Sequence, residues 1–213
     1  MKSIRVFLFV LMLQYFTVWA GVRKVDIQER VILAGGHSFG DTGPYEKIRG
    51  TLYYEIDPGN PANAAIVDLR LAPRNERGMV ECSGDFLLLK PVDMTKANRR
   101  LLYDVNNRGN LYMLRNLNDA RGSNDPQTLA HCGNGFLMRQ GYCLLWSGWN
   151  WDVVDSHHLL QFRVPAVTDN GVPIRQRIAA EMVNGGSLEP LPVMTLAWGN
   201  SRCYPSAHFP DNA

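Results

Sequence analysis

Two strand-like segments separated by helical turns constrain the fold of this chain more than any other feature. Residues 98–106 are predicted to form a strand, and residues 142–146 are an apolar run typical of another. Between them we expect a short helix over residues 111–117 and one or two helical turns over residues 134–140, closed by Gly141. A helical crossover normally makes the two strands that it joins parallel neighbours in one sheet.

The chain before this unit is predicted to consist of strands separated by turns rich in Gly and Pro. β-branched and aromatic residues indicate strands within residues 22–34 and over 49–57, and residues 65–71 alternate apolar and polar side chains. Residues 80–91 contain an apolar run typical of a strand buried on both sides. Because an antiparallel start precedes a parallel unit, we expect the α/β class: a mixed β-sheet with an antiparallel β-rich start.

Residues 1–20 have the three-part pattern of a secretory signal peptide. Lys2 and Arg5 precede an uncharged apolar segment, and Val18 and Ala20 supply the small residues that a cleavage site before Gly21 requires. We therefore expect a periplasmic or secreted protein whose mature part is residues 21–213. An uncleaved membrane anchor and a buried core helix are the alternative interpretations.

The charge balance of the mature part argues against nucleic acid as a partner. Removing Lys2 and Arg5 from the 22 basic residues leaves 20, which equals the 20 acidic residues. No long basic run is present. We also expect no cofactor and no metal, because there is no Gly-rich phosphate loop and His157 and His158 are adjacent, so their side chains do not share a face.

The cysteines leave the disulfide pattern open. The sequence contains four, Cys82, Cys132, Cys143 and Cys203, and four cysteines allow three complete pairings. Export makes bridges feasible, and the spacing matches no zinc site. Cys143 lies within an apolar run, where a buried free thiol is the alternative.

The pattern Gly36-His37-Ser38-Phe39-Gly40 matches the G-x-S-x-G elbow that carries a nucleophilic serine. That motif requires a sharp turn between a strand and a helix. Here turn-forming residues 41–44 follow, so we interpret Ser38 as part of a structural loop.

Two other loops follow predicted strands and are candidate binding sites. Asn107, Arg108, Gly109 and Asn110 end the first strand of the crossover unit, where a Gly lets backbone N–H groups approach a ligand as an oxyanion hole requires. The alternative is that they are ordinary turn residues. Trp149, Trp151 and Asp152 follow the second strand, where they line a pocket or only cover the edge of the core.

Seven short motifs occur together in order: SFGDTGPYE (38–46), NPAN (60–63), residues 68–75 ending in APRN, NRGN (107–110), GSNDP (122–126), GNGFL (133–137) and WSGWNWD (146–152). In this set the chain resembles the bacterial "alpha/beta hydrolase domain-containing" proteins from about Val22 onward. The resemblance implies the N-terminal part of an α/β-hydrolase fold that cleaves esters or amides. It also implies that residues 100–106 lead to the oxyanion loop.

In the resembled family the nucleophile, acid and histidine come later in the chain than anything corresponding to residues 21–213. The resemblance therefore implies that Ser38 is not the nucleophile and that this chain contains no catalytic residue. We expect the N-terminal part of an exported serine hydrolase that is inactive alone. The alternatives are a non-catalytic β-rich binding module of the cell envelope, and a chain that pairs with a complementary C-terminal chain.

Overall fold

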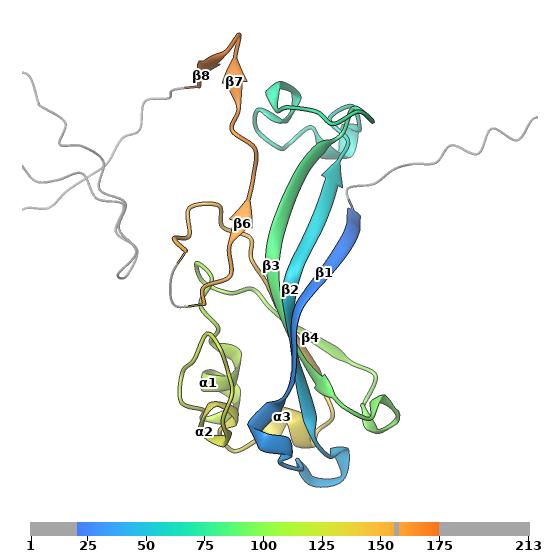
Figure 1. The fold of residues 1–213 in the computed structure, drawn as a ribbon, viewed down its shortest axis with the longest axis vertical. Coiled ribbons are helices and arrows are strands. Elements are labelled where there is room, and N and C mark those ends of the chain that lie inside the picture. Colours follow the sequence, from blue (N-terminus) through green and yellow to red (C-terminus); the bar gives the residue numbers. More distant parts are fainter. Residues whose placement is uncertain (1–20, 156–157, 175–213) are drawn as a thin grey trace, which may run out of the picture.

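Three long strands dominate the protein. The structure is a computed structural model that describes residues 21–155 and 158–174 (Figure 1). The strands β1 (Gly21–Ile32), β2 (Tyr45–Ile56) and β3 (Val80–Pro91) have 12 residues each and pair antiparallel in that order. These strands confirm the predictions for residues 22–34, 49–57 and 80–91. The predicted signal peptide lies outside the described residues.

A glycine allows the three strands to approach each other at the centre of the ribbon. A Cβ atom on Gly50 would lie 2.0 Å from the carbonyl oxygen of Asp26 on β1 and 2.9 Å from the ring of Phe86 on β3. Phe86 is the register partner of Gly50 and is buried. Any side chain at position 50 would therefore push β1 or Phe86 away from β2.

The strands β4 (Leu101–Asp104) and β5 (Cys143–Ser147) form the only parallel pair among the described strands. The helices α1 (Met113–Asn118), α2 (Leu129–Cys132) and α3 (Phe136–Arg139) lie between them in the chain. β5 also pairs antiparallel with β3, so the sheet order is β1-β2-β3-β5-β4. The structure thus confirms the predicted crossover between parallel neighbours.

The remaining described elements are short. β6 (Phe162–Arg163) pairs with β3, and β7 (Thr168–Asp169) and β8 (Val172–Pro173) form a separate hairpin. Five 3-10 turns complete the list: Leu33–Gly36, Gly40–Thr42, Pro61–Asn63, Leu69–Leu71 and Met94–Lys96. Within residues 21–155 and 158–174, no helix is long and apolar enough to cross a membrane.

The main core lies where the three helices cover one end of the sheet (Figure 1). Leu87 and Leu89 of β3 and Leu144 and Trp146 of β5 are fully buried there against side chains of α1 and α3. The alternation of these positions along each strand directs them to one face of the sheet. A second, much smaller cluster of Leu69, Ala72 and Val80 lies at the other end.

The predicted α/β fold class is wrong: the protein has a β-rich fold and not the opening of an α/β-hydrolase fold. A long antiparallel ribbon supplies most of the sheet, and the three helices have only four to six residues each. An α/β fold needs repeated crossovers whose helices cover both faces of a mainly parallel sheet. The described part has one such crossover, at one end of the ribbon.

The strand predicted over residues 65–71 is also wrong. This segment consists of turns and the 3-10 turn Leu69–Leu71, and Asp68 has a left-handed backbone conformation with φ 58°. A left-handed residue reverses the local direction of the chain, so the apolar–polar alternation there does not continue as an extended strand.

Candidate functional site

The two loops that the sequence predicted as binding sites lie against each other. β4 and β5 are parallel and Asp104 is the register partner of Trp146, so both strands end at the same edge of the sheet. The guanidinium of Arg108 forms an ion pair with the carboxylate of Asp152. The indole N–H of Trp149 donates a hydrogen bond of 2.7 Å to the carbonyl oxygen of Asn106.

Asn106 joins the two loops, although sequence reasoning did not include it among the site residues. Its side chain is buried, and the Nδ2 group donates to the carbonyl oxygen of Ser147 at the end of β5. Its Oδ1 atom accepts a hydrogen bond of 2.8 Å from the backbone N–H of Gly109. A buried asparagine with both ends bonded fixes the separation of the loops. The sequence signal that could have indicated this role is an Asn three residues before a Gly at the end of a strand, a pattern typical of a turn that the Asn side chain stabilises.

Gly109 is required by both its conformation and its surroundings. Its φ is +80°, and a Cβ atom would lie 2.7 Å from the backbone N and O atoms of Leu160. Its N–H is bonded to Asn106, and the N–H of Asn110 is bonded to the carbonyl oxygen of Asn107 at 3.1 Å. In this conformation neither amide is directed at a ligand. These two amides therefore do not form an oxyanion hole in this conformation.

Two buried polar atoms of the same loops have no hydrogen-bond partner within the described residues: Arg108 Nε, a donor, and Asn150 Oδ1, an acceptor. Arg108 also has a left-handed backbone with φ 50°, a conformation that costs free energy in a residue with a side chain. Unpaired buried groups are costly unless a ligand or water bonds them. The loops thus contain one unpaired donor and one unpaired acceptor, both shielded from solvent.

The two tryptophans present large exposed apolar surfaces beside these groups. The exposed fraction is 52% for Trp149 and 63% for Trp151. Trp151 lines a shallow depression of about 280 Å³ with Val153 and with residues 161–164. Exposed aromatic rings next to a charged pair are typical of a surface that binds a partly apolar molecule.

Ser38 lies apart from these loops, in the turn between β1 and β2 beside α3. Its hydroxyl donates to the carbonyl oxygen of Gly40 at 3.3 Å, and the 3-10 turn Gly40–Thr42 follows it. Thr42 in turn bonds the carbonyl oxygen of Arg139. No hydrogen bond joins a serine to a histidine in the described part of the chain, so the geometry there offers no serine nucleophile with a base.

No match to a known protein assigns a role to this site. Comparisons with family models, with curated proteins and with solved structures found no match.

The described residues contain no metal site and no disulfide. No group of three or more His, Cys, Asp or Glu side chains could hold a metal ion within residues 21–155 and 158–174. Cys82, Cys132 and Cys143 are free thiols. Cys203 and His157 lie outside the described residues. The carbonyl oxygen of His158 accepts a hydrogen bond of 2.8 Å from Arg49.

Proposed function

We propose that this chain is the N-terminal part of an exported hydrolase of ester or amide bonds, and that it holds the substrate without performing the reaction. The observation that carries the proposal is the meeting of the loops after β4 and β5, where the Arg108–Asp152 ion pair lies beside Trp149 and Trp151. The order of the seven motifs supports the same chemistry. The described part of the chain itself has a β-rich fold.

The arrangement suits a partly apolar substrate with one polar group. The side chain of Arg108, which is 29% exposed, can donate to a carbonyl oxygen of the substrate. A nucleophile supplied by another part of the protein would then attack the bound carbonyl. Binding and oxyanion contributions without a nucleophile leave only a small residual acceleration.

The direct experiment measures hydrolysis of 4-nitrophenyl butyrate by the 213-residue chain. We expect no turnover above the buffer rate. If the chain hydrolyses the ester, the proposal that the nucleophile lies in another part of the protein is wrong. If Ser38→Ala also abolishes this turnover, Ser38 is the nucleophile and not part of a structural loop.

The DNA after codon 213 tests the positive half of the proposal. A continuing reading frame with a serine elbow supports the hydrolase, and a stop codon contradicts a single-chain enzyme. In the longer protein, Arg108→Gln should lower kcat/KM by about tenfold, because a hydrogen bond to a charged group contributes about 1.5 kcal/mol or more. Arg100→Gln is the matched control, since Arg100 is exposed and its side chain forms no ion pair with another described residue.

A complementary C-terminal chain is a second candidate, and the edge of the sheet supports it. β4 is the edge strand of the sheet in the described part of the chain, and Leu101 and Tyr103 on it, with Val105 just after it, are exposed. Exposed apolar residues on an unpaired edge strand favour addition of another chain. The alternative, a non-catalytic envelope binding module, is favoured by the β-rich fold. Cooperative unfolding of a stable monomer would support the module, whereas aggregation would support a missing partner.

A further inference from the structure

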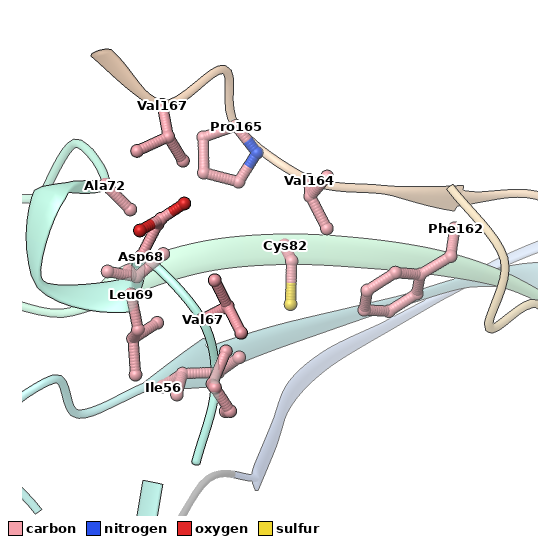
Figure 2. Close-up of a pocket in the computed structure, with 12 residues that line it drawn as sticks. Ile56, Val67, Asp68, Leu69, Ala72, Cys82, Phe162, Val164, Pro165 and Val167 are labelled. Carbon is pink, nitrogen blue, oxygen red and sulfur yellow. The ribbon is translucent and has the colours of Figure 1, made fainter. Parts of the chain in front are cut away.

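A cavity of about 400 Å³ lies at the end of the ribbon opposite the helices (Figure 2). Its floor is formed by β2 and β3, and its two walls are the turn segment of residues 66–72 and the strap of residues 162–167. The lining residues are Ile56, Ile66, Val67, Asp68, Leu69, Ala72, Val80, Cys82, Phe162, Val164, Pro165 and Val167. No function described above uses this cavity.

The strap is held in place by contacts outside the cavity. Arg163 donates two hydrogen bonds to the carboxylate of Asp85 on β3, at 2.7 and 3.2 Å. Gly84 is the register partner of Phe162, and a Cβ atom there would lie 3.0 Å from the Phe162 ring. The ring therefore packs against bare backbone at one end of the cavity. These contacts fix the wall without filling the space behind it.

The lining determines which molecules the cavity accepts. Ten of its twelve residues are aliphatic or aromatic, and the exceptions are Asp68 and the thiol of Cys82. An inserted peptide would bring N–H and C=O groups that find almost no partners there, at a cost of about 1–3 kcal/mol for each unpaired group. An aliphatic chain has no such groups. With water occupying about 30 Å³, the space suits roughly a dozen non-hydrogen atoms.

We infer that this cavity binds the aliphatic chain of a small molecule whose polar end is neutral or cationic. Asp68 is the only charged residue of the lining, and it forms no ion pair within the described part of the chain. A carboxylate at the rim repels an anionic end group and attracts an ammonium group. The inference does not depend on the proposed hydrolase.

Cys82 provides a built-in reporter of occupancy. It is buried in the cavity lining, and burial raises the pKa of its thiol to about 11, so alkylation is slow but measurable. The experiment measures iodoacetamide labelling of each cysteine by peptide mass spectrometry, with and without octan-1-ol. At about ten times the Kd of octan-1-ol, labelling of Cys82 should slow by about tenfold. Cys132, which is fully buried in the main core, is the internal control and should not change.

Two pairs of comparisons locate the site. Val164→Trp fills the cavity mouth and should abolish the protection, whereas Val172→Trp, at an exposed valine outside the lining, should not. Octylamine should protect Cys82 at lower concentration than octanoate, and Asp68→Asn should remove that difference. Circular dichroism of each variant checks that it folds.

Three results would overturn the inference. The first is unchanged labelling of Cys82 at saturating octan-1-ol and octylamine. The second is equal protection in Val164→Trp and Val172→Trp. The third is that octan-1-ol leaves Cys82 labelling unchanged but deletion of residues 175–213 changes it. The occupant of the cavity would then be the chain's own C-terminal segment. None of these measurements uses ester hydrolysis, so failure of the hydrolase proposal leaves them unaffected.

Discussion

The same three strands have very different surroundings at their two ends. Near Tyr45 and Leu89, the helices α1–α3 and the 3-10 turn Leu33–Gly36 cover the sheet and complete a core of fully buried side chains. Near Ile56 and Val80, the described part of the chain covers the sheet with only a turn segment and a strap, and a cavity remains. Both ends have apolar strand residues, so the difference comes from what packs on them.

This contrast indicates which end stabilises the protein and which end is available for binding. Close packing contributes to stability through every contact that it completes, and a cavity removes such contacts. An end that leaves space is less able to stabilise the fold but can accept a ligand. We therefore expect mutations to be costly at the helix-covered end and milder at the cavity end.

The largest expected effect compares one leucine at each end. Leu89 is fully buried in the main core, whereas Leu69 lies in the small cluster that borders the cavity. Leu89→Ala should lower the free energy of unfolding by about 4 kcal/mol and Leu69→Ala by about 2 kcal/mol, because an existing space makes the second loss smaller. Urea denaturation measures both. Equal losses would show that the two ends contribute alike.

The next effect concerns a fully buried lysine at the helix-covered end. Lys47 on β2 forms ion pairs with Glu29 on β1, at 3.1 Å, and with Asp125 in the segment before α2. Lys47→Met should lower the free energy of unfolding by about 3 kcal/mol, since removal of one partner leaves buried charge without compensation. Lys24→Met, at an exposed lysine of β1, should change it little. A gain in stability in Lys47→Met would mean that packing, and not pairing, matters there.

The sequence predicts local elements well because their signals are local. The strand over residues 80–91 was placed at its observed bounds, and the parallel β4–β5 pair followed from the helical turns between them. The fold class was wrong because one crossover does not determine how many more follow or which face they cover. The number of crossovers and the faces that they cover depend on tertiary packing, which cannot be predicted from the pattern of each segment alone.

The sites show the same limit. The positions of the loops 107–110 and 149–152 after strands could be predicted because turn residues and tryptophans follow the strand patterns. The contact of Asn106 with Ser147 could not, because the two residues are distant in sequence. The cavity was missed because residues 65–71 alternate like a strand. The left-handed Asp68 turns those apolar side chains toward β2 and β3 instead.

A smaller effect tests the junction of the two candidate loops. Asn106→Ala removes the bonds to Ser147 and Gly109 and should lower the free energy of unfolding by about 2 kcal/mol, because buried backbone groups lose their partners. Asn107→Ala is the matched control, since the Asn107 side chain is exposed and forms no hydrogen bond within residues 21–155 and 158–174. Urea denaturation compares the two variants. Similar values for both would mean that Asn106 does not hold the loops together.

The smallest effect is an acid dependence at Asp125. Burial raises the pKa of this carboxyl group, but hydrogen bonds from Lys47 and Gln127 outweigh burial and lower the pKa below its ordinary value. A carboxyl group with a lowered pKa in the folded state stabilises the protein above its unfolded pKa of about 3.9, and this stabilisation is lost as the pH falls through the folded value. Asp125→Asn should therefore cost about 1 kcal/mol at neutral pH.

The difference in free energy of unfolding between the wild type and Asp125→Asn should shrink as the pH falls below about 4. Urea denaturation from neutral pH down to about pH 2.5 measures it. Asp41→Asn is the control, because Asp41 is exposed and its carboxylate accepts no hydrogen bond from the residues that the structure describes. A difference that stays constant with pH would show that the Asp125 contacts depend on shape and not on charge. The helix-covered end would then owe its greater stability to apolar packing alone.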